Sequence, residues 1–352
     1  MSKTITIRDV AKSAGVSIGT VSRVINNAEN VGNDAYQKTI NAIKSLNYKP
    51  LKIRGLRNKV PQKATTLGHI GVIFVGAAAS GDIYYEYLRS IEEAAASRGF
   101  QIIVKYLNRN DAAESLKFLP QSEVRGLLLK GAFDVDLIER IKNKIPVVGL
   151  GMYNPSLDIL QVTVDDHQAA HEAVNALYDM GHRKIAFINH DLKHPKFFLR
   201  ASGFIEATKL KGIYRPDFLI EQNCTSFTCE DNLASIDMTK ATELVFSLDC
   251  HPTAVICAND LGAAGFCIAM KRHGFRVGDD ISIVGFDNTL PLCEIMEVPL
   301  ASVQLPFERV AKHSTNLLIN IIENKNLSSG HAVHLFPCRF ISRKSVIDLT
   351  AR

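Results

Sequence analysis

The sequence lacks any apolar run of the roughly 18–20 residues that a helix needs to span a bilayer. Its first residues, Met1-Ser-Lys-Thr, lead directly into a polar helical pattern, without the apolar segment of a secretory signal peptide. We therefore expect no membrane association and a cytoplasmic location. The 352 residues are 46% hydrophobic and 22% charged, ordinary values for globular proteins, and the length predicts two or three domains with sizeable cores.

Cysteine is present but lacks the pattern of a disulfide framework. The seven cysteines are odd in number, and most lie in apolar strings such as the one from Ala254 to Ala258. This usage favours reduced, buried thiols in a reducing compartment. Cys224 and Cys229 lie close together in the sequence but have no second pair, so we expect no zinc site there.

Short catalytic motifs are also missing. No Gly-x-Gly-x-x-Gly follows a predicted strand, no Gly-Lys-Ser/Thr phosphate loop occurs, and no Gly-x-Ser-x-Gly elbow joins a predicted strand to a helix. We expect neither catalytic residues nor a cofactor. His167 and His171 have the spacing of a metal-binding pair on a helix, but no glutamate stands where such a motif needs one. The two histidines are therefore interpreted as part of a solvated helix face.

A helix-turn-helix pattern occupies residues 6–25. Thr6 is a suitable N-cap for a first short helix, Gly15 stands where that helix must end in a left-handed conformation, and Ser17 can cap a second helix. Small apolar residues recur at helical spacing in both helices, at Val10, Ala11, Ala14, Val21, Val24 and Ile25. The second helix of such a unit can enter the major groove of DNA. The alternative is an ordinary helical hairpin in a globular core.

Positive charge is concentrated in the first 60 residues. This segment holds eleven Lys or Arg and three acids, for a net charge of +8, whereas the whole chain is +5. Residues 61–352 therefore carry a net charge of −3. Lys and Arg give affinity for DNA because they displace the counterions of its phosphates. The charge distribution favours DNA binding over the hairpin interpretation.

Three regions follow from the pattern of apolar residues. A third predicted helix, from about Asn33 to Leu46, completes a DNA-binding head over residues 1–49. Residues 50–66 are basic, contain two prolines and show no apolar periodicity, which is typical of a hinge and linker. Residues 67–352 form the remaining region, the core.

Short apolar strands alternate with helices throughout residues 67–352. The predicted strands are 69–75, 99–106, 124–129, 145–150, 162–164, 184–188, 253–257 and 281–285. The predicted helices are 83–97, 135–143, 167–180, 200–211, 232–248 and 261–273. This alternation predicts parallel sheets wrapped by helices. Two such sets with a cleft between them would make a two-lobed α/β ligand-binding core.

Motifs of one known family occur in order along nearly the whole chain. In the head they are Thr6-Ile-Arg-Asp-Val-Ala, Gly15-Val-Ser and Thr20-Val-Ser-Arg-Val-Ile-Asn. In the core they are the segments that begin at Leu177, Arg200, Ala258, Asp280, Pro299 and Arg343. With these motifs the sequence resembles the lactose/galactose repressor (LacI/GalR) family of bacterial transcription regulators. The resemblance implies a homodimeric repressor of carbohydrate-related genes, with a helix-turn-helix head, a hinge, and an effector-binding and dimerisation core like a periplasmic sugar-binding protein, in which a small effector changes affinity for operator DNA.

The resemblance also assigns DNA contacts in the head. It implies contacts to base edges from Ser17, Ile18, Gly19, Ser22 and Arg23. Of these, Arg23 best matches guanine, because its planar fork fits O6 and N7, and Ile18 can pack against a thymine methyl group. Contacts to phosphates, which position without specifying, are implied for Thr6, Thr20 and Asn26.

The hinge departs from the family pattern. A Pro-x-x-x-Ala-Arg-x-Leu motif forms a short helix in the family, and its leucine enters the minor groove. Here the segment from Pro50 to Leu56 is one residue shorter. We expect Arg54 and Leu56 to keep their minor-groove roles, and the alternative is a flexible basic tether.

Effector contacts are implied in the core. Arg200 resembles the family's arginine that faces the cleft, and Asp287 its acid after the Val-Gly-Phe strand, so we expect the two to face each other across the cleft. Such a pair suits a polyhydroxylated ligand, since each can bind vicinal hydroxyls. Asn259 and Asp260 follow another parallel strand, at the edge where α/β sheets bind ligands. Tyr84 can stack on a sugar or base ring, unless it is a surface tyrosine.

The effector is expected to be a small polar metabolite, a carbohydrate or its derivative. Gly151 stands where many sugar-responsive relatives have an acid, which argues against a simple hexose. A secreted sugar-binding receptor with the same core fold is the competing class of protein. The basic head and the missing signal-peptide pattern argue against it.

Overall fold

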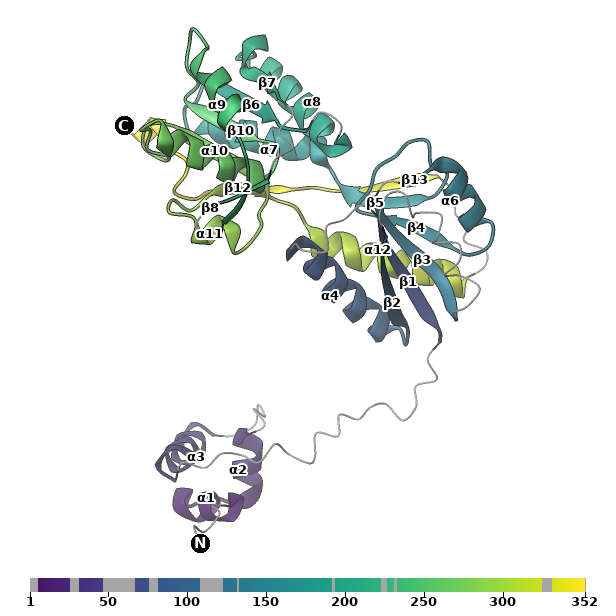
Figure 1. Cartoon of the computed structure of the whole chain (residues 1–352). Helices are drawn as coiled ribbons and strands as arrows, with labels where there is room; N and C mark the ends of the chain where they lie inside the picture. The colour runs from purple at the N-terminus through teal and green to yellow at the C-terminus, as the bar shows by residue number, and fades with distance from the viewer. Residues whose placement is uncertain are drawn as a thin grey trace. The chain divides into compact units, whose positions relative to one another are not determined.

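A computed structural model of the chain describes the regular elements of both the head and the core (Figure 1). The described residues are 6–25, 32–46, 67–75, 82–107, 123–131, 133–191, 194–222, 227–230, 233–324 and 331–351. The chain divides into two compact units, Met1–Ala64 and Thr65–Arg352. The head and the core each have an apolar interior of their own.

The head is a three-helix unit, as the sequence predicts. Its helices are α1 (Ile7–Ala14), α2 (Ile18–Ile25) and α3 (Asn33–Ser45). The apolar positions at helical spacing meet in one small core that contains Val10, Ala11, Ala14, Val21 and Ala42. A core of this size leaves most of the head's surface polar.

Local hydrogen bonds fix the turn between α1 and α2. The amide and the hydroxyl of Thr6 donate to the carboxylate of Asp9 at 2.8 and 2.6 Å, which completes a capping box. Gly15 ends α1 with φ +65°, in the left-handed region. The amide of Thr20 donates to Ser17 Oγ at 3.0 Å and so caps α2. The predicted roles are confirmed: Thr6 is the N-cap of α1, Gly15 ends that helix, and Ser17 caps α2.

The first lobe of the core is built on a six-stranded parallel sheet. Its strand order is β13 (Ala332–Phe336), β5 (Leu160–Val164), β4 (Val147–Leu150), β3 (Val124–Gly131), β1 (His69–Val75) and β2 (Gln101–Leu107). Helices α4 (Asp82–Ser97) and α12 (Phe307–Glu323) pack together on one face, and α6 (Val135–Lys142) covers the other. Because side chains alternate along a strand, Val72 and Phe74 contribute to the core with α4 and α12, whereas Ile73 and Val75 contribute to the core with α6.

The second lobe has a second six-stranded sheet. Its strand order is β14 (Arg339–Ile341), β12 (Ala301–Gln304), β11 (Ser282–Asp287), β10 (Ala254–Cys257), β6 (Ile185–Asn189) and β7 (Leu219–Glu221), and only β14 is antiparallel. Helices α7 (Asp166–Asp179) and α8 (Pro195–Leu210) share one core with the sheet. The opposite face packs with α9 (Thr239–Phe246) and α10 (Asp260–Arg272). The short helix α11 (Leu292–Ile295) follows β11.

The chain passes between the two lobes three times, between β5 and α7, between β12 and α12, and between β13 and β14 (Figure 1). Two of these crossings are joined by hydrogen bonds. The amide of Asp165 donates to the carbonyl of Phe336 at 2.9 Å, and the amide of Cys338 donates to Gln168 Oε1 at 2.8 Å. Adjacent crossings joined in this way form the lobe hinge, which is separate from the hinge segment of residues 50–66.

One predicted helix is wrong in its first part. Residues 232–248 were expected to be helical, but Leu233–Ile236 is the strand β9, which pairs with β8 (Phe227–Glu230) in a hairpin. The helix begins only at Thr239, because the carboxylate of Asp237 accepts hydrogen bonds from the amide and the hydroxyl of that residue at 3.0 and 2.7 Å. The sequence pattern also missed α12 and the strands β12, β13 and β14.

Candidate DNA-binding and effector sites

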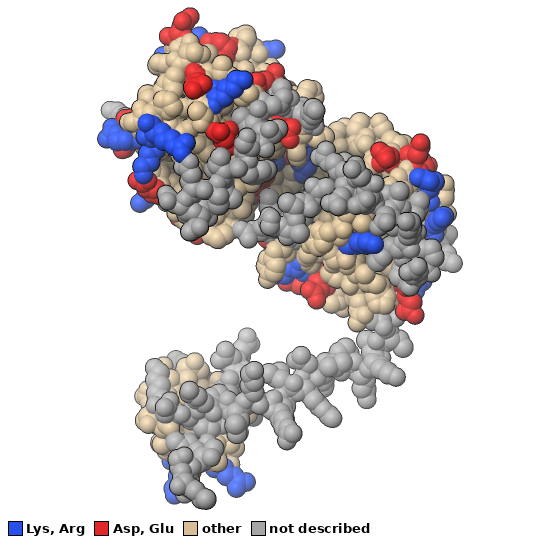
Figure 2. Space-filling view, viewed as in Figure 1, with Lys and Arg blue, Asp and Glu red and all other residues tan. Residues whose placement is uncertain are grey.

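The first turn of α2 is open to solvent. Ser17, Ile18 and Gly19 are exposed, whereas Val21 and Val24 on the same helix are buried in the core of the head. Ile18 is 47% exposed, so its side chain is accessible to a binding partner. Figure 2 shows Lys and Arg side chains on the surface of the head. An exposed helix end on a basic unit is the arrangement that a recognition helix needs.

Several predicted DNA contacts also stabilise the starts of α1 and α2. Ser17 Oγ and Thr20 Oγ1 lie 2.9 Å apart, and the Thr6 hydroxyl bonds to Asp9. A hydroxyl has one donor and two acceptor positions, so each can still reach a phosphate or a base. The DNA contacts of these three residues, and those of Ile18, Gly19 and Ser22, remain predictions.

For the remaining predicted DNA contacts, either the side chain or the whole residue lies outside the described part of the chain. Arg23 stands on α2, but its side chain is outside the described part of the chain. Asn26, Arg54 and Leu56 also lie outside the described residues. Their roles remain predictions.

Arg200 is a buried arginine of the second lobe that bonds to three partners. It stands on α8 and is only 2% exposed. Its Nε donates to Asp166 Oδ1 at 2.8 Å, its Nη1 to the carbonyl of Ala258 at 2.6 Å, and its Nη2 to Asp287 Oδ1 at 3.3 Å. Burial lowers the pKa of the guanidinium, but Asp166 and Asp287 raise it by more, so Arg200 stays charged.

The expectation that Arg200 and Asp287 face each other across the cleft is wrong. Both belong to the second lobe, and they are in direct contact. The reason is topological, since α8 packs on the sheet that contains β11, and Asp287 is the last residue of that strand. A ligand would therefore meet them as one group on a single wall.

Asp287 begins a strained turn. Its φ is +104° and that of Asn288 is +55°, values that residues other than glycine rarely adopt. The turn is held because Asn288 Oδ1 accepts a hydrogen bond from Arg343 at 2.7 Å and its amide donates to Ser302 Oγ at 3.0 Å. Burial raises the pKa of the Asp287 carboxyl, although Arg200 and Lys196 lower it. Such strain is typical of positions where a side chain is fixed for binding.

Asn259 and Asp260 have structural bonds. Asn259 caps α10, because its side chain accepts a hydrogen bond from the amide of Gly262 at 2.8 Å. The Asp260 carboxylate accepts from the hydroxyl of Ser302 and the amide of Thr289, both at 2.7 Å. Burial and the nearby Asp287 raise the pKa of Asp260 to about 7. These bonds use only part of the hydrogen-bonding capacity of each side chain, and the predicted role of both residues in effector binding is untested.

The first lobe contributes groups that the sequence analysis missed. Lys130 lies near the end of β3, with its amino group 4.7 Å from the centre of the buried Tyr87 ring. Burial and the charge of Lys196 lower the pKa of Lys130 to about 7, while Asp166 and Asp287 raise it. Those three charged residues belong to the second lobe, so charges of the second lobe act on the Lys130 amino group in the first. A lysine at the carboxyl end of a predicted strand was the available signal.

Gly151, in the first lobe, has no room for a side chain. Its φ is +56°, and a Cβ there would lie 2.5 Å from the hydroxyl of Tyr87 and 3.0 Å from Lys130 Nζ. Tyr87 and Lys130 therefore occupy the space that a side chain at this position would need. Tyr84, the predicted stacking residue, lies one turn earlier on α4, and its side chain is outside the described part of the chain.

Two neutral histidines complete the second-lobe wall. His190 and His194 flank the ring of Phe197, with ring centres 4.9 and 4.2 Å away, and the guanidinium of Arg200 lies over the same ring at 5.6 Å. Burial lowers the pKa of each imidazole to about 4, so both are neutral near pH 7. Among the described residues, neither Nδ1 atom has a hydrogen-bond partner. A polar ligand could supply one.

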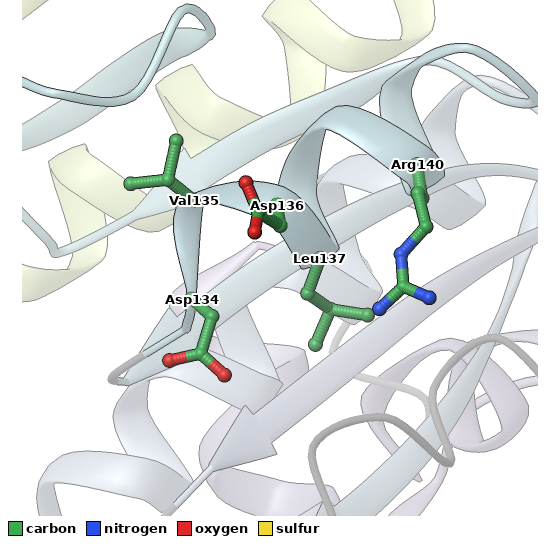
Figure 3. Close-up of a pocket in the computed structure, with 5 residues that line it drawn as sticks. All are labelled: Asp134, Val135, Asp136, Leu137 and Arg140. Carbon is green, nitrogen blue, oxygen red and sulfur yellow. The ribbon is translucent and has the colours of Figure 1, made fainter.

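A separate depression of about 410 Å³ lies at the start of α6 (Figure 3). Its lining comes from that helix and the residue before it, namely Asp134, Val135, Asp136, Leu137 and Arg140. Helix α6 covers the face of the first sheet opposite α4 and Tyr87. The depression is therefore distinct from the group around Arg200 and Lys130.

Comparisons with known proteins decide the family. A model of bacterial regulatory proteins of the lacI family matches residues 6–50, and a periplasmic binding protein-like domain matches residues 174–346. The HTH-type transcriptional repressor PurR of Histophilus somni is 30% identical over 356 residues, which cover 98% of this chain and 99% of that protein. The chain belongs to the LacI family of bacterial regulatory proteins.

Further relatives of this LacI-family chain agree in length and fold. The HTH-type transcriptional repressor CytR of Escherichia coli is 28% identical over 346 residues, covering 97% of this chain and 96% of the relative. The crystal structure of the Lac repressor dimer bound to operator and the anti-inducer ONPF has the same fold, with a TM-score of 0.65 and 24% identity over 98% of this chain and 100% of that one. The resemblance and the fold class predicted from the sequence are confirmed. The chain is a DNA-binding transcriptional regulator with a two-lobed effector-binding core.

Proposed function

We propose that this LacI-family regulator is a homodimeric repressor of carbohydrate-related genes, without catalytic activity, that works in the cytoplasm. It reads a pseudo-palindromic operator with α2 and binds a small polar effector between its lobes. The effector site is supported by the buried Arg200–Asp287 pair at the end of β11, and by the charges of Asp166 and Asp287, which raise the pKa of Lys130 in the first lobe. The Lac repressor dimer, whose structure contains operator, supports the dimeric arrangement and the DNA partner.

The head's contacts divide into two groups. Ser17, Ile18 and Gly19 meet base edges because they form the exposed first turn of α2, and Ser22 and Arg23 extend this contact by one turn. Contacts that position the head on phosphates come from Thr6, Thr20 and Asn26, and those in the minor groove from Arg54 and Leu56.

The effector is held by groups from both lobes. Arg200 and Asp287 bind its hydroxyls from the second lobe, and Phe197 offers an apolar face between His190 and His194. Lys130 approaches it from the first lobe, and Tyr84 stacks on its ring. Asn259 and Asp260 shape this wall through their bonds to the loops after β10 and β11.

Effector binding acts on the lobe hinge through Arg200. Its partner Asp166 directly follows Asp165, whose amide bonds to Phe336 in a neighbouring crossing. A ligand that changes the position of Arg200 therefore acts on Asp166, which lies beside the lobe hinge. It shifts the equilibrium between lobe arrangements only by its difference in affinity for the two, which amounts to about 1–3 kcal/mol in typical allosteric proteins.

Footprinting of bound sites in the genome tests the proposal, followed by gel shifts with the sites found. We expect binding to pseudo-palindromes near genes of carbohydrate metabolism, with retention lost when either half-site is scrambled. Equal retention of intact and scrambled DNA would contradict sequence-specific regulation. Specific binding beside genes of another kind would leave the DNA-binding role standing and overturn the carbohydrate assignment.

A further inference from the structure

Helices α7 and α8 bring together three side chains with metal-binding atoms. His167 and His171 stand one turn apart on α7, and Glu206 stands on α8. The Nε2 atoms of the two histidines lie 2.9 and 3.7 Å from the same carboxylate oxygen, Oε2 of Glu206. One nitrogen or oxygen atom from each of the three residues lies within 4.8 Å of the others. The glutamate that the local sequence around His167 lacks is thus supplied by the neighbouring helix.

A close helix contact makes this arrangement possible. A Cβ at Gly203 on α8 would lie 2.3 Å from the carbonyl oxygen of His167, so only glycine lets the two helices approach so closely here. Figure 1 shows α7 and α8 as neighbours in the second lobe. Glu206 follows Gly203 by three residues and so lies on the same face of α8, beside the histidine pair.

We propose that His167, His171 and Glu206 bind one divalent transition-metal ion, with Zn²⁺ as the best match. Two imidazole nitrogens and one carboxylate oxygen are ligands that Zn²⁺ prefers, and they leave a fourth position for water. Atoms bound to one tetrahedral zinc at about 2.0–2.1 Å lie roughly 3.3 Å apart, and the two observed separations fall on either side of that value. Small rotations of the side chains would complete the site.

The site is accessible and lies beside the effector machinery. His167, His171 and Glu206 are 38, 23 and 55% exposed, so an ion can enter from solvent. His167 directly follows Asp166, the partner of Arg200. A bound ion would fix α7 to α8 near the Asp166–Arg200 pair, and so stabilises the second lobe against thermal unfolding.

Calorimetric titration of the untagged, metal-free, full-length protein with ZnCl₂ tests the site. We expect saturable binding of one ion per chain and a higher melting temperature in its presence. The variants His171→Ala and Glu206→Gln are each expected to lose about tenfold or more in affinity, since each removes a ligand, from a half-buried and an exposed side chain respectively. Co²⁺ in place of Zn²⁺ should give visible absorption that both variants lose.

Two control variants locate the binding. Glu243→Gln changes an exposed glutamate on α9, and His313→Ala removes one member of the His313–His334 pair in the first lobe, whose ring nitrogens lie 2.8 Å apart. Both controls should bind Zn²⁺ as the wild type does. The proposal is overturned if wild-type protein binds no Zn²⁺ at equimolar concentrations near 100 µM, a weak limit for a protein site. It is equally overturned if His171→Ala and Glu206→Gln bind normally, or if binding is lost in His313→Ala instead.

Discussion

The guanidinium of Arg200 and the carboxylate of Asp166 are joined at 2.8 Å, with both side chains only 2% exposed. Asp166 is the first residue of α7, immediately after the chain enters the second lobe, and Arg200 also bonds to Asp287 at the end of β11. One buried network thus joins the proposed effector residues Arg200 and Asp287 to Asp166, which lies beside the lobe hinge. Because buried charges need their partners, a change in the position of Asp287 also changes the surroundings of Asp166.

Loss of one partner in this network should destabilise the second lobe. Asp166→Asn leaves Arg200 with one carboxylate, and we expect a loss of about 3 kcal/mol in the free energy of unfolding, measured by urea denaturation. Asp217→Asn breaks the exposed Arg215–Asp217 pair and should cost less than about 1 kcal/mol. Equal effects of the two substitutions would show that burial does not determine the strength of the Asp166–Arg200 pair.

Acid should destabilise the protein through His190 and His194. Burial lowers both pKa values from 6.5 to about 4, so the unfolded chain binds more protons than the folded one between these values. Stability therefore falls as the pH decreases from about 6.5 to 4. The double variant His190→Asn/His194→Asn should show a smaller fall in melting temperature over this range. His251→Asn, at an exposed position, should behave as the wild type, and a matching improvement in that control would refute the assignment to the buried pair.

Arg23 should specify one base pair. Arg23→Ala is expected to weaken binding to the preferred operator by about 1–3 kcal/mol and to relax the preference at that position, as measured by anisotropy with a set of single-base operator variants. Lys38→Ala removes a charge from α3, where Lys38 already pairs with Asp34, and should leave the preference unchanged. If Arg23→Ala weakens binding to all sequences equally, the side chain contacts phosphates and not a base.

Leu56 should act as a wedge in the minor groove. Leu56→Ala is expected to lower specific affinity and to reduce DNA bending, since insertion of an apolar side chain unstacks a base step at a cost that added contacts offset. Bending is measured by circular-permutation gel shifts or by energy transfer across the operator. Unchanged bending with the variant would show that residues 50–66 act only as a flexible tether.

The head could be predicted from sequence because its determinants are local. Thr6, Gly15 and Ser17 act within three or four residues of their partners, so the turn can be read from the chain. The alternation of strands and helices likewise predicts two parallel sheets. The prediction of a helix over 232–248 failed because residues 233–236 pair with β8 in a hairpin, and this pairing outweighed the apolar pattern.

The sites depend on contacts between distant segments. The sequence expects Arg200 and Asp287 to bind one ligand from opposite sides of a cleft, but their direct contact follows from how α8 packs on the sheet, which spacing does not reveal. Lys130 is in the other lobe, and the charges of Asp166 and Asp287 raise its pKa. Glu206 is 35 residues beyond His171, so only the packing of α7 on α8 brings it to the histidines.

Operator binding measured with and without an effector tests the central claim most directly. Thermal-shift screening against sugars and nucleosides identifies the effector, and anisotropy then gives operator affinity for the wild type and for Asp287→Ala. We predict that the effector changes wild-type affinity by about 5–150-fold, that Asp287→Ala binds operator normally without effector, and that the effector neither stabilises this variant nor changes its affinity. If the effector stabilises both proteins equally and changes operator affinity equally in both, it binds elsewhere, and the proposed switch at Arg200 and Asp287 is wrong.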